Sequence, residues 1–320
     1  MGCVNSGKNT QKNPGFWYTK MQPTSLIQTQ NPVQDVLRDF LHVNRATGPE
    51  WNIAGFGGRQ RDIDYDCLVD AGKFNVLDTD YVEKFLKSVH DTIFESGCVC
   101  SLLEKHHPHG GPILIDLDFR YENTDVLQRR FTDTMIRKFV EGYIGALYRF
   151  FHMSKSKPLR FFVLKKDGPV AEKGKHQDGI HIHCPDLTLT PEEQYILRGY
   201  ALQQNLIQNI FDETGFTNVE HDVFDGSIIH RNNWFLYGAS KPNKSPYKVH
   251  NIYRVSGDNE IIEENINKYT TLELTQLLSI RHGHQILSSL IVLEERKSEW
   301  KALGNLWGNG KSTPNRNMFD

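Results

Sequence analysis

Two carboxylates at the end of an apolar run could bind a cation. The stretch GPILIDLDFRY starts at Gly111 and leads through apolar residues into Asp116 and Asp118. Alternate side chains of an extended strand point to the same face, so these carboxylates can converge. Two like charges are costly to bury unless a cation lies between them, and Mg²⁺ and Mn²⁺ prefer carboxylate oxygen. The pair could instead cap a helix or form ion pairs with Arg120 or Arg129, so the motif alone leaves both readings open.

A second group of residues could bind an anion. In KHQDGIHIHCPD, His181 and His183 alternate onto one face of a predicted strand. Gly179 leaves room for a bulky group to approach the backbone. The loop before the strand is basic and contains Lys165, Lys166, Lys173 and Lys175. A lone strand histidine is more often a hydrogen-bonded core residue, but two histidines beside this loop favour an anion-binding pocket.

The stretch DVFDGSIIHRNNWFLYGASKPNK combines an acid with basic side chains. It supplies Asp225, which we expect on a strand, followed by Arg231 and then by Ser240 and Lys241. Cationic side chains around carboxylates are useful when a triphosphate brings negative charge and metal ions bridge it to the acids. Asp222 could replace Asp225 as the relevant acid, and an ordinary charged surface hairpin is the alternative interpretation.

The elements that must position these residues are a mixture of helices and strands. Periodicity predicts helices over 78–97, 124–151 and 271–303. Another helix should start at Thr190, with Pro191 in its first turn and Glu193 completing a capping box. Strands are predicted at 160–164, 179–184, 225–230, 234–237 and 249–255. Because helices and strands do not alternate strictly, the pattern favours an α+β fold.

Composition limits the class of protein and its surroundings. The 320 residues carry a formal net charge of −2, so any anion-binding surface must be local. The five cysteines contain no CxxC pair, which argues against a disulfide framework and a structural zinc site; they are Cys3, Cys67, Cys98, Cys100 and Cys184. We therefore expect an intracellular setting.

The two ends of the chain differ from its middle. Residues 1–32 are polar and aperiodic and are predicted to be a disordered tail. The tail begins MGCVNS, which matches an N-myristoylation pattern at Gly2 with Cys3 as a second acylation site, but a chance match is favoured and no stable membrane association is expected. Residues 304–320 are predicted to be a flexible end or a linker.

Taken in order, the three motifs resemble the archaeo-eukaryotic primase superfamily. The phrases LIDLDFRY, DGIHIHCP and RNNWFLYGASKP carry the likeness over roughly residues 80–255. They are most similar to the N-terminal primase domain of the primase-helicases of nucleocytoplasmic large DNA viruses of the poxvirus type. The second motif of the family usually begins with a small polar residue, and here Gly179 stands in its place.

The resemblance implies a fold and a set of site residues. The fold would be a catalytic core over 33–256, with an RRM-like sheet unit beside an N-terminal α/β unit, and a helical extension over 257–303. Asp116, Asp118 and Asp225 would bind two Mg²⁺ or Mn²⁺ ions, with His181 completing the catalytic group. The nucleotide-binding residues would be Gly179, His181, Arg231, Ser240 and Lys241, together with Lys175.

The resemblance also implies a reaction and partners. The reaction would be two-metal nucleotidyl transfer from an NTP or dNTP, making short primers on a single-stranded DNA template at sites of DNA replication. A superfamily 3 helicase would follow in the full-length protein. The sequence GNGKST near Lys311 is not a P-loop, because Asn305 occupies the position that requires glycine.

Three other functions compete with this prediction. An HUH-type endonuclease would use His181 and His183 with a nucleophilic tyrosine, for which Tyr195 or Tyr200 could serve, but it leaves the acid pair without a role. A glycosyltransferase that binds a nucleotide-sugar through Mn²⁺ explains only the acid pair. A non-catalytic nucleic-acid-binding module would keep the basic loop and tolerate loss of the aspartates.

Overall fold

The structure is a computed structural model. It describes residues 32–55, 72–76, 80–123, 126–153, 158–256, 260–283, 288 and 290–310. The predicted tail up to residue 31, the acylation pattern at Gly2 and Cys3, and the end from Lys311 lie outside the described residues. No helix in the described part of the chain is long and apolar enough to cross a membrane.

A large antiparallel sheet carries most of the predicted motifs. Within the described ranges its strands follow the order β10-β9-β5-β7-β4, and β6 pairs with β7. Along the chain, β4, α3, β5, β7, α4 and β9 follow the βαββαβ succession of an RRM-like unit. The strands are β4 (Gly111–Glu122), β5 (Leu159–Lys165), β6 (Val170–Glu172), β7 (Lys175–Leu189), β9 (Lys248–Val255) and β10 (Ile261–Glu264).

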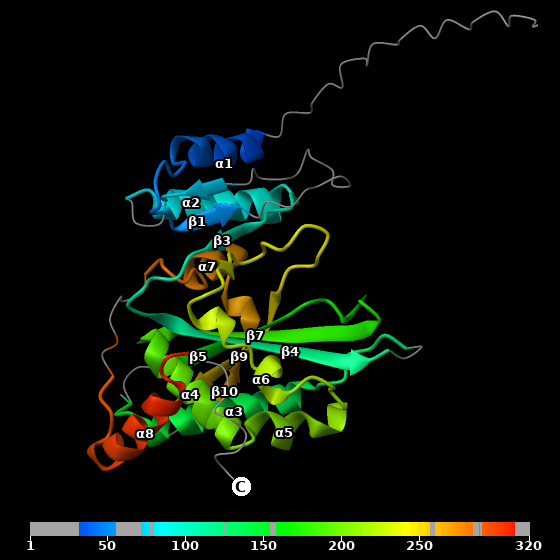
Figure 1. Cartoon of the computed structure of the whole chain (residues 1–320). Helices are drawn as coiled ribbons and strands as arrows, with labels where there is room; N and C mark the ends of the chain where they lie inside the picture. The colour runs from blue at the N-terminus through cyan, green and yellow to red at the C-terminus, as the bar shows by residue number, and fades with distance from the viewer. Residues whose placement is uncertain are drawn as a thin grey trace, which may run out of the picture. The chain divides into compact units, whose positions relative to one another are not determined.

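Helices cover one face of this sheet (Figure 1). Ile115, Leu117 and Phe119 on β4 are buried in a core that they share with these helices. The intervening Asp116 and Asp118 consequently point to the opposite face. The helices are α3 (Asp133–Phe150), α4 (Pro191–Gln203), α5 (Leu206–Phe211) and α8 (Lys297–Trp307).

A smaller antiparallel sheet forms a second core. Its order is β2-β1-β3-β8, and Leu37, Phe85 and Leu102 are among its buried residues. Glu104 on β3 accepts hydrogen bonds from the Ser279 hydroxyl and the Ile280 amide, at 2.5 and 2.8 Å. The elements of this unit are α1 (Pro32–Val43), β1 (Ile53–Gly55), β2 (Gly72–Phe74), α2 (Val82–His90), the π-helix η2 (Asp91–Glu95), β3 (Leu102–Glu104) and β8 (Trp234–Phe235), and α7 (Thr271–Leu277) packs on α2.

The predicted α+β class is confirmed, and the best-defined helix start is also confirmed. Thr190 and Glu193 form the capping box, and Pro191 is the first residue of α4. The strands predicted at 160–164, 179–184 and 249–255 lie within β5, β7 and β9. These segments combine strong apolar alternation or a capping signal with burial, so local and tertiary preferences agree.

Four local predictions were wrong in extent or type, and one is the strand expected at 234–237, of which only Trp234–Phe235 forms β8. The helix expected from 124 begins at Asp133, because the Thr132 hydroxyl accepts a hydrogen bond from the Met135 amide and caps it there. The strand expected at 225–230 is instead the 3₁₀ turn η4 (Ser227–Ile229). The helix expected over 271–303 is divided into α7, the 3₁₀ turn η6 (Glu294–Arg296) and α8.

The described C-terminal region packs on the sheet and its helices. Strand β10 pairs with β9, so the sheet extends beyond the expected boundary at residue 256. Leu303 on α8 belongs to the main core, and Arg149 on α3 forms an ion pair with Glu299 at 2.9 Å. The segment expected to become flexible from residue 304 continues as helix to Trp307.

Candidate active site

The acid pair occupies the face of the large sheet that the main helices leave uncovered. In the β4–β7 ladder, Asp116 lies opposite His181 and Asp118 lies opposite Gly179. This register places the histidine and both carboxylates on one face, because side chains directly opposite each other project to the same side. The sequence placed Asp116 with Asp118 on one strand face and His181 with His183 on another, and the pairing of β4 with β7 makes these one face.

Burial of Asp116 and the like charges around it make the acid pair unfavourable in the absence of a cation. The Asp116 side chain is 13% exposed, and its Oδ1 atom has no hydrogen-bond partner within the described part of the chain. Burial, and then the charges of Asp118 and Asp225, raise the pKa of Asp116 well above its ordinary value. Burial and the charge of Asp225 also raise the pKa of Asp118. A carboxylate oxygen that is buried and unsatisfied fits a bound divalent cation.

Two lysines supply positive charge near the pair. Lys166 and Lys241 each lower the pKa of both Asp116 and Asp118, opposing the effect of burial. The same two lysines, after burial, lower the pKa of His181 well below its ordinary value. The imidazole is therefore neutral near pH 7 and can donate one hydrogen bond and accept another.

Aromatic rings hold His181 from two sides. The Tyr247 ring is stacked on the imidazole with 3.5 Å between ring centroids, and the Trp234 centroid lies at 4.5 Å. His181 Nε2 lies 3.5 Å from Asp116 Oδ1. This packing fixes the plane of the imidazole beside the acid pair.

A loop brings Asp225 to the edge of β4. The Asp225 amide donates to the Asp116 carbonyl at 3.0 Å, and Phe224 forms an isolated β-bridge with Leu117. The Asp225 carboxylate accepts hydrogen bonds from the Ser227 amide and hydroxyl, at 2.8 and 2.6 Å. These bonds explain why the chain turns after Asp225 and does not continue as the expected strand.

A buried arginine supports this loop from α4. Arg198 is 3% exposed and donates to the carbonyls of Phe224 and His221, at 2.7 and 2.8 Å. Burial lowers its pKa to about 10, and the charge of Asp225 opposes that shift. A Cβ added to Gly226 would lie 3.1 Å from the Arg198 guanidinium carbon, so the loop passes close to it.

A cavity of about 360 Å³ lies beside the third acid. Asp118, Asp222 and Asp225 all line it, together with Arg231 and Gly310. The Arg231 guanidinium donates to the Gly310 carbonyl at 2.5 Å, so the chain just after α8 forms one wall. Asp222 on α6 (Glu220–Val223) is exposed, whereas Asp225 is partly buried, and both lie within this cavity's lining.

The described side chains bring two carboxylates onto one face but do not form a complete metal site. Within the described ranges, no group of three histidine, cysteine or acidic side chains is gathered at metal-binding distances. Asp116 and Asp118 share a face, while Asp225 is directed to Ser227. Each carboxylate oxygen has more than one lone pair, so Asp225 can keep these bonds and still bind a cation.

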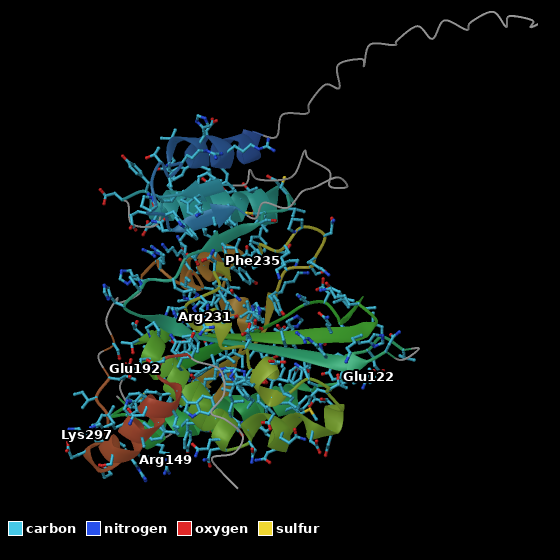
Figure 2. All side chains as sticks on the ribbon, in the orientation of Figure 1. Glu122, Arg149, Glu192, Arg231, Phe235 and Lys297 are labelled. Carbon is cyan, nitrogen blue, oxygen red and sulfur yellow. The ribbon has the colours of Figure 1, made fainter. Side chains whose placement is uncertain are left out.

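The remaining predicted nucleotide-binding residues divide between the acid centre and other places. Lys241 acts on the acid pair through its charge, and Ser240 is buried with its amide bonded to the Cys100 carbonyl at 2.9 Å. Lys175 is the first residue of β7, and its Nζ atom lies 3.3 Å from Glu122 Oε1. Figure 2 shows Glu122 at the tip of β4, well separated from Arg231. The structure does not bring Lys175 to the acid centre.

The structure gives little support to the alternative roles of Arg129 as an ion-pair partner of the acids and of Tyr195 or Tyr200 as a nucleophile. Arg129 pairs with Asp178 at 2.8 Å and not with the acid pair. The Tyr195 hydroxyl is 2.9 Å from His230 Nδ1, and Tyr200 packs edge-on against Phe150. Both tyrosines thus have partners other than the histidines of β7.

Sequence reasoning named Lys166 only as part of the basic loop, and it missed Arg198 and Tyr247. Lys166 follows β5 with the same alternation as Leu164, which lies opposite His181, and this alternation indicates its face. The sequence analysis assigned no role to Arg198, whose burial depends on the loop that it supports. Tyr247 lies in the turn before β9, and no local pattern indicates that its ring reaches His181.

Comparison with known proteins identifies related chains. Residues 65–253, more than half of the chain, match the family model described as the C962R protein N-terminal AEP domain, an archaeo-eukaryotic primase domain. A protein of Acanthamoeba polyphaga mimivirus, named as a candidate helicase, L207/L206, is 30% identical over 214 residues. This alignment covers 63% of the chain and 22% of the mimivirus protein, so the chain spans about a fifth of that relative's length.

Proposed function

The chain belongs to the family of the C962R protein N-terminal AEP domain, and from this premise we propose that it is a DNA-dependent primase-polymerase domain. In this proposal it synthesises short primers on single-stranded DNA by nucleotidyl transfer from an NTP or dNTP. The observation that carries the proposal is the acid pair on β4, in which the largely buried Asp116 and the more exposed Asp118 share a face beside a neutral histidine and near two lysines. That combination suits a metal-bound triphosphate better than a structural ion pair.

The three acids would position the divalent cations. Asp116 and Asp118 present their carboxylates on one face of β4, and Asp225 lies at its edge. Two Mg²⁺ or Mn²⁺ ions, when bound there, would activate the attacking 3′-hydroxyl and stabilise the leaving pyrophosphate. Ser227 would orient Asp225 through its two hydrogen bonds, as groups behind a metal ligand commonly do.

The cationic and polar side chains would bind the triphosphate. Lys166 and Lys241 lie within electrostatic reach of the acids, and His181 is fixed between Tyr247 and Trp234. A neutral imidazole can donate to a phosphate oxygen without adding a third charge. Arg231 on the other side of Asp118 would contact phosphate after releasing the Gly310 carbonyl.

The partners follow from the same proposal. A single-stranded DNA template would lie across the acid centre, and the reaction would take place inside the cell at sites of viral-type DNA replication. The helicase name of the mimivirus relative, and the small fraction of it that is aligned, support a helicase region fused after this domain. A superfamily 3 helicase is the type proposed.

Primer synthesis on single-stranded DNA tests the proposal. Labelled nucleotides would be supplied with Mg²⁺ or Mn²⁺ to the protein and to its Asp116→Ala, Asp118→Ala double variant. We expect short products from the protein and none from the variant, since the variant lacks the proposed cation ligands. Glu141→Ala is the control, because Glu141 is an exposed acid on α3, a helix of the covered face of the sheet.

The outcomes separate the competing functions. Products that persist in the double variant, with unfolding temperatures equal in all three proteins, would contradict the role of the acid pair. If the protein makes no product and both proteins bind DNA equally, a binding module explains the data better. A covalent protein–DNA adduct that is lost on Tyr195→Phe would favour the endonuclease.

A further inference from the structure

Tyr247 lies at the centre of the proposed site although it belongs to none of the three sequence motifs. Its ring is stacked on His181 with an interplanar angle of 15°. The Lys166 ammonium lies 4.7 Å from the centroid of the same ring, which is a cation–π distance. One phenol thus contacts the histidine and one of the two lysines that act on the acid pair.

The hydroxyl of Tyr247 occupies the space left by a missing side chain. A Cβ added to Gly179 would lie 2.5 Å from the Tyr247 hydroxyl oxygen, a distance that real Cβ atoms do not show. The same Cβ would lie 3.1 Å from Asp118 Oδ1. The phenol oxygen and the Asp118 carboxylate therefore flank the same point above Gly179, opposite Asp118 in the ladder.

This arrangement explains why position 179 is a glycine. Its backbone does not require glycine, because Gly179 is not among the glycines with positive φ. What excludes a side chain is the phenol. A hydroxyl at this point could donate a hydrogen bond to a metal-bound phosphate next to Asp118.

We propose that Tyr247 is a positioning residue for the incoming nucleotide, with its ring fixing His181 and its hydroxyl donating to a phosphate oxygen above Gly179. Gly179 and Tyr247 then act as one unit, in which a distant residue supplies the polar group that position 179 lacks. The inference rests on the proposed nucleotidyl transfer and adds a residue to it. A tyrosine that only fills space would be replaced by phenylalanine without effect on nucleotide binding.

Exchanging the hydroxyl between the two positions tests the proposal. Tyr247→Phe keeps the stacked ring and removes the donor, so the KM for nucleotide should rise about tenfold with a smaller change in kcat. Gly179→Ser alone should be as impaired or worse, because its side chain meets the phenol. The double variant Gly179→Ser, Tyr247→Phe relieves this contact and returns a hydroxyl, so its KM should recover toward that of the unmodified protein.

The double variant Gly179→Ala, Tyr247→Phe is the matched control. It relieves the same contact but returns no donor, so its KM should stay near that of Tyr247→Phe. Thermal shifts on adding nucleotide with Mg²⁺ provide a second readout that does not require turnover, and unfolding temperatures without nucleotide report folding.

The results of these measurements distinguish failure of the Tyr247 assignment from failure of the proposed function. If serine and alanine at position 179 behave alike in the phenylalanine background, the hydroxyl has no role in binding and the inference is overturned. An unchanged KM in Tyr247→Phe overturns it as well. If the unmodified protein makes no primers and shows no nucleotide-dependent shift, the proposed function fails, and that result is distinct from a failure of the Tyr247 assignment.

Discussion

The two sides of the acid centre are built in different ways. One side, the strand flank, consists of Asp116, Asp118 and His181 on paired strands β4 and β7. The other, the loop flank, consists of Asp225, Ser227 and the rest of residues 224–231. The strand flank is positioned by a continuous ladder, whereas the loop flank is held by a few hydrogen bonds from Arg198 and Ser227.

The difference explains how each flank can fail. A slip of one residue in β4 would place Asp116 and Asp118 in the apolar core and Ile115 on the site face, so register is strongly specified. The loop flank has no comparable apolar alternation on its own. Its geometry depends on satisfying backbone carbonyls with one buried guanidinium, which makes it the more sensitive of the two to single substitutions.

The largest effect is expected from removing the acid of the loop flank. Asp225→Asn keeps the shape of the side chain but removes the charge that would bind a cation, and it replaces one of the two oxygens that accept from Ser227 with an amide donor. Primer synthesis should fall about 1,000-fold, because the contribution of a catalytic metal ion is several kcal/mol. Measured kcat/KM on single-stranded DNA gives the result.

Asp222→Asn is the matched control for that change. Asp222 lines the same cavity but is exposed on α6, so its loss should reduce synthesis by less than about tenfold. A larger loss in Asp222→Asn than in Asp225→Asn would reverse the assignment of the third acid.

The contrast between the flanks also explains what the sequence could predict. On the strand flank, period-two alternation predicted that Asp116 and Asp118 share a face and that His181 and His183 share a face, and the β4–β7 register joins the two faces. The capping box at Thr190 and Glu193 is equally local, and it fixed the start of α4 correctly. Signals of this kind need no knowledge of distant contacts.

On the loop flank the decisive contacts are distant in sequence. The sequence predicts a strand at Asp225 because an apolar pair follows it. Hydrogen bonds from Ser227 and Arg198 instead hold the chain in a turn there. Arg198 lies on α4, and no local pattern assigns it to this loop. Tyr247 likewise reaches His181 from 66 positions away. Such tertiary contacts override local propensity, and one sequence cannot reveal them.

The next effect in size is on stability and comes from the support of the loop flank. Arg198→Met leaves the buried carbonyls of Phe224 and His221 without their donor. Each unsatisfied buried group costs about 1–3 kcal/mol, so the free energy of unfolding should fall by about 3 kcal/mol. Urea denaturation measures this change, and primer synthesis should fall with it because Asp225 loses its position.

Arg149→Met provides the comparison on the surface. Arg149 pairs with Glu299 on α8, but both side chains are 35% exposed. A partly exposed ion pair contributes under about 1 kcal/mol, so this variant should be only slightly destabilised. Equal losses in the two variants would show that the loop flank does not depend on Arg198 in particular.

A smaller effect is expected from the residue that orients Asp225. Ser227→Ala removes the hydroxyl bond at 2.6 Å and keeps the amide bond at 2.8 Å. Stability should fall by about 1 kcal/mol. Primer synthesis should fall about 10-fold, with a raised requirement for Mg²⁺, since partners of metal ligands tune affinity by about 10–100-fold. An unchanged Mg²⁺ titration would indicate that the hydroxyl does not orient the acid.

The smallest effect concerns Glu104, which lies outside both flanks and supports the apolar cluster around Ile280. Glu104 is fully buried on β3 and holds the Ile280 amide, and Ile280 packs with Leu114 and Trp234. Burial raises the pKa of Glu104 to about 7, although the bonds from Ser279 and Ile280 oppose that shift. The buried carboxyl is therefore favoured in its protonated form.

The sign of the pH dependence follows from that raised pKa. Stability from the protonated carboxyl is fully present below pH 4.5, the value expected in the unfolded chain, and is lost as pH rises through about 7. Between pH 6 and pH 8 the free energy of unfolding should fall by about 1 kcal/mol. The side chain in Glu104→Gln cannot ionise. Urea denaturation of this variant at the two pH values should therefore not show the fall in the free energy of unfolding that comes from Glu104. If the unmodified protein and the variant lose stability equally over this interval, Glu104 does not titrate in the folded state. The contribution of Glu104 to the apolar cluster around Ile280 is then independent of pH.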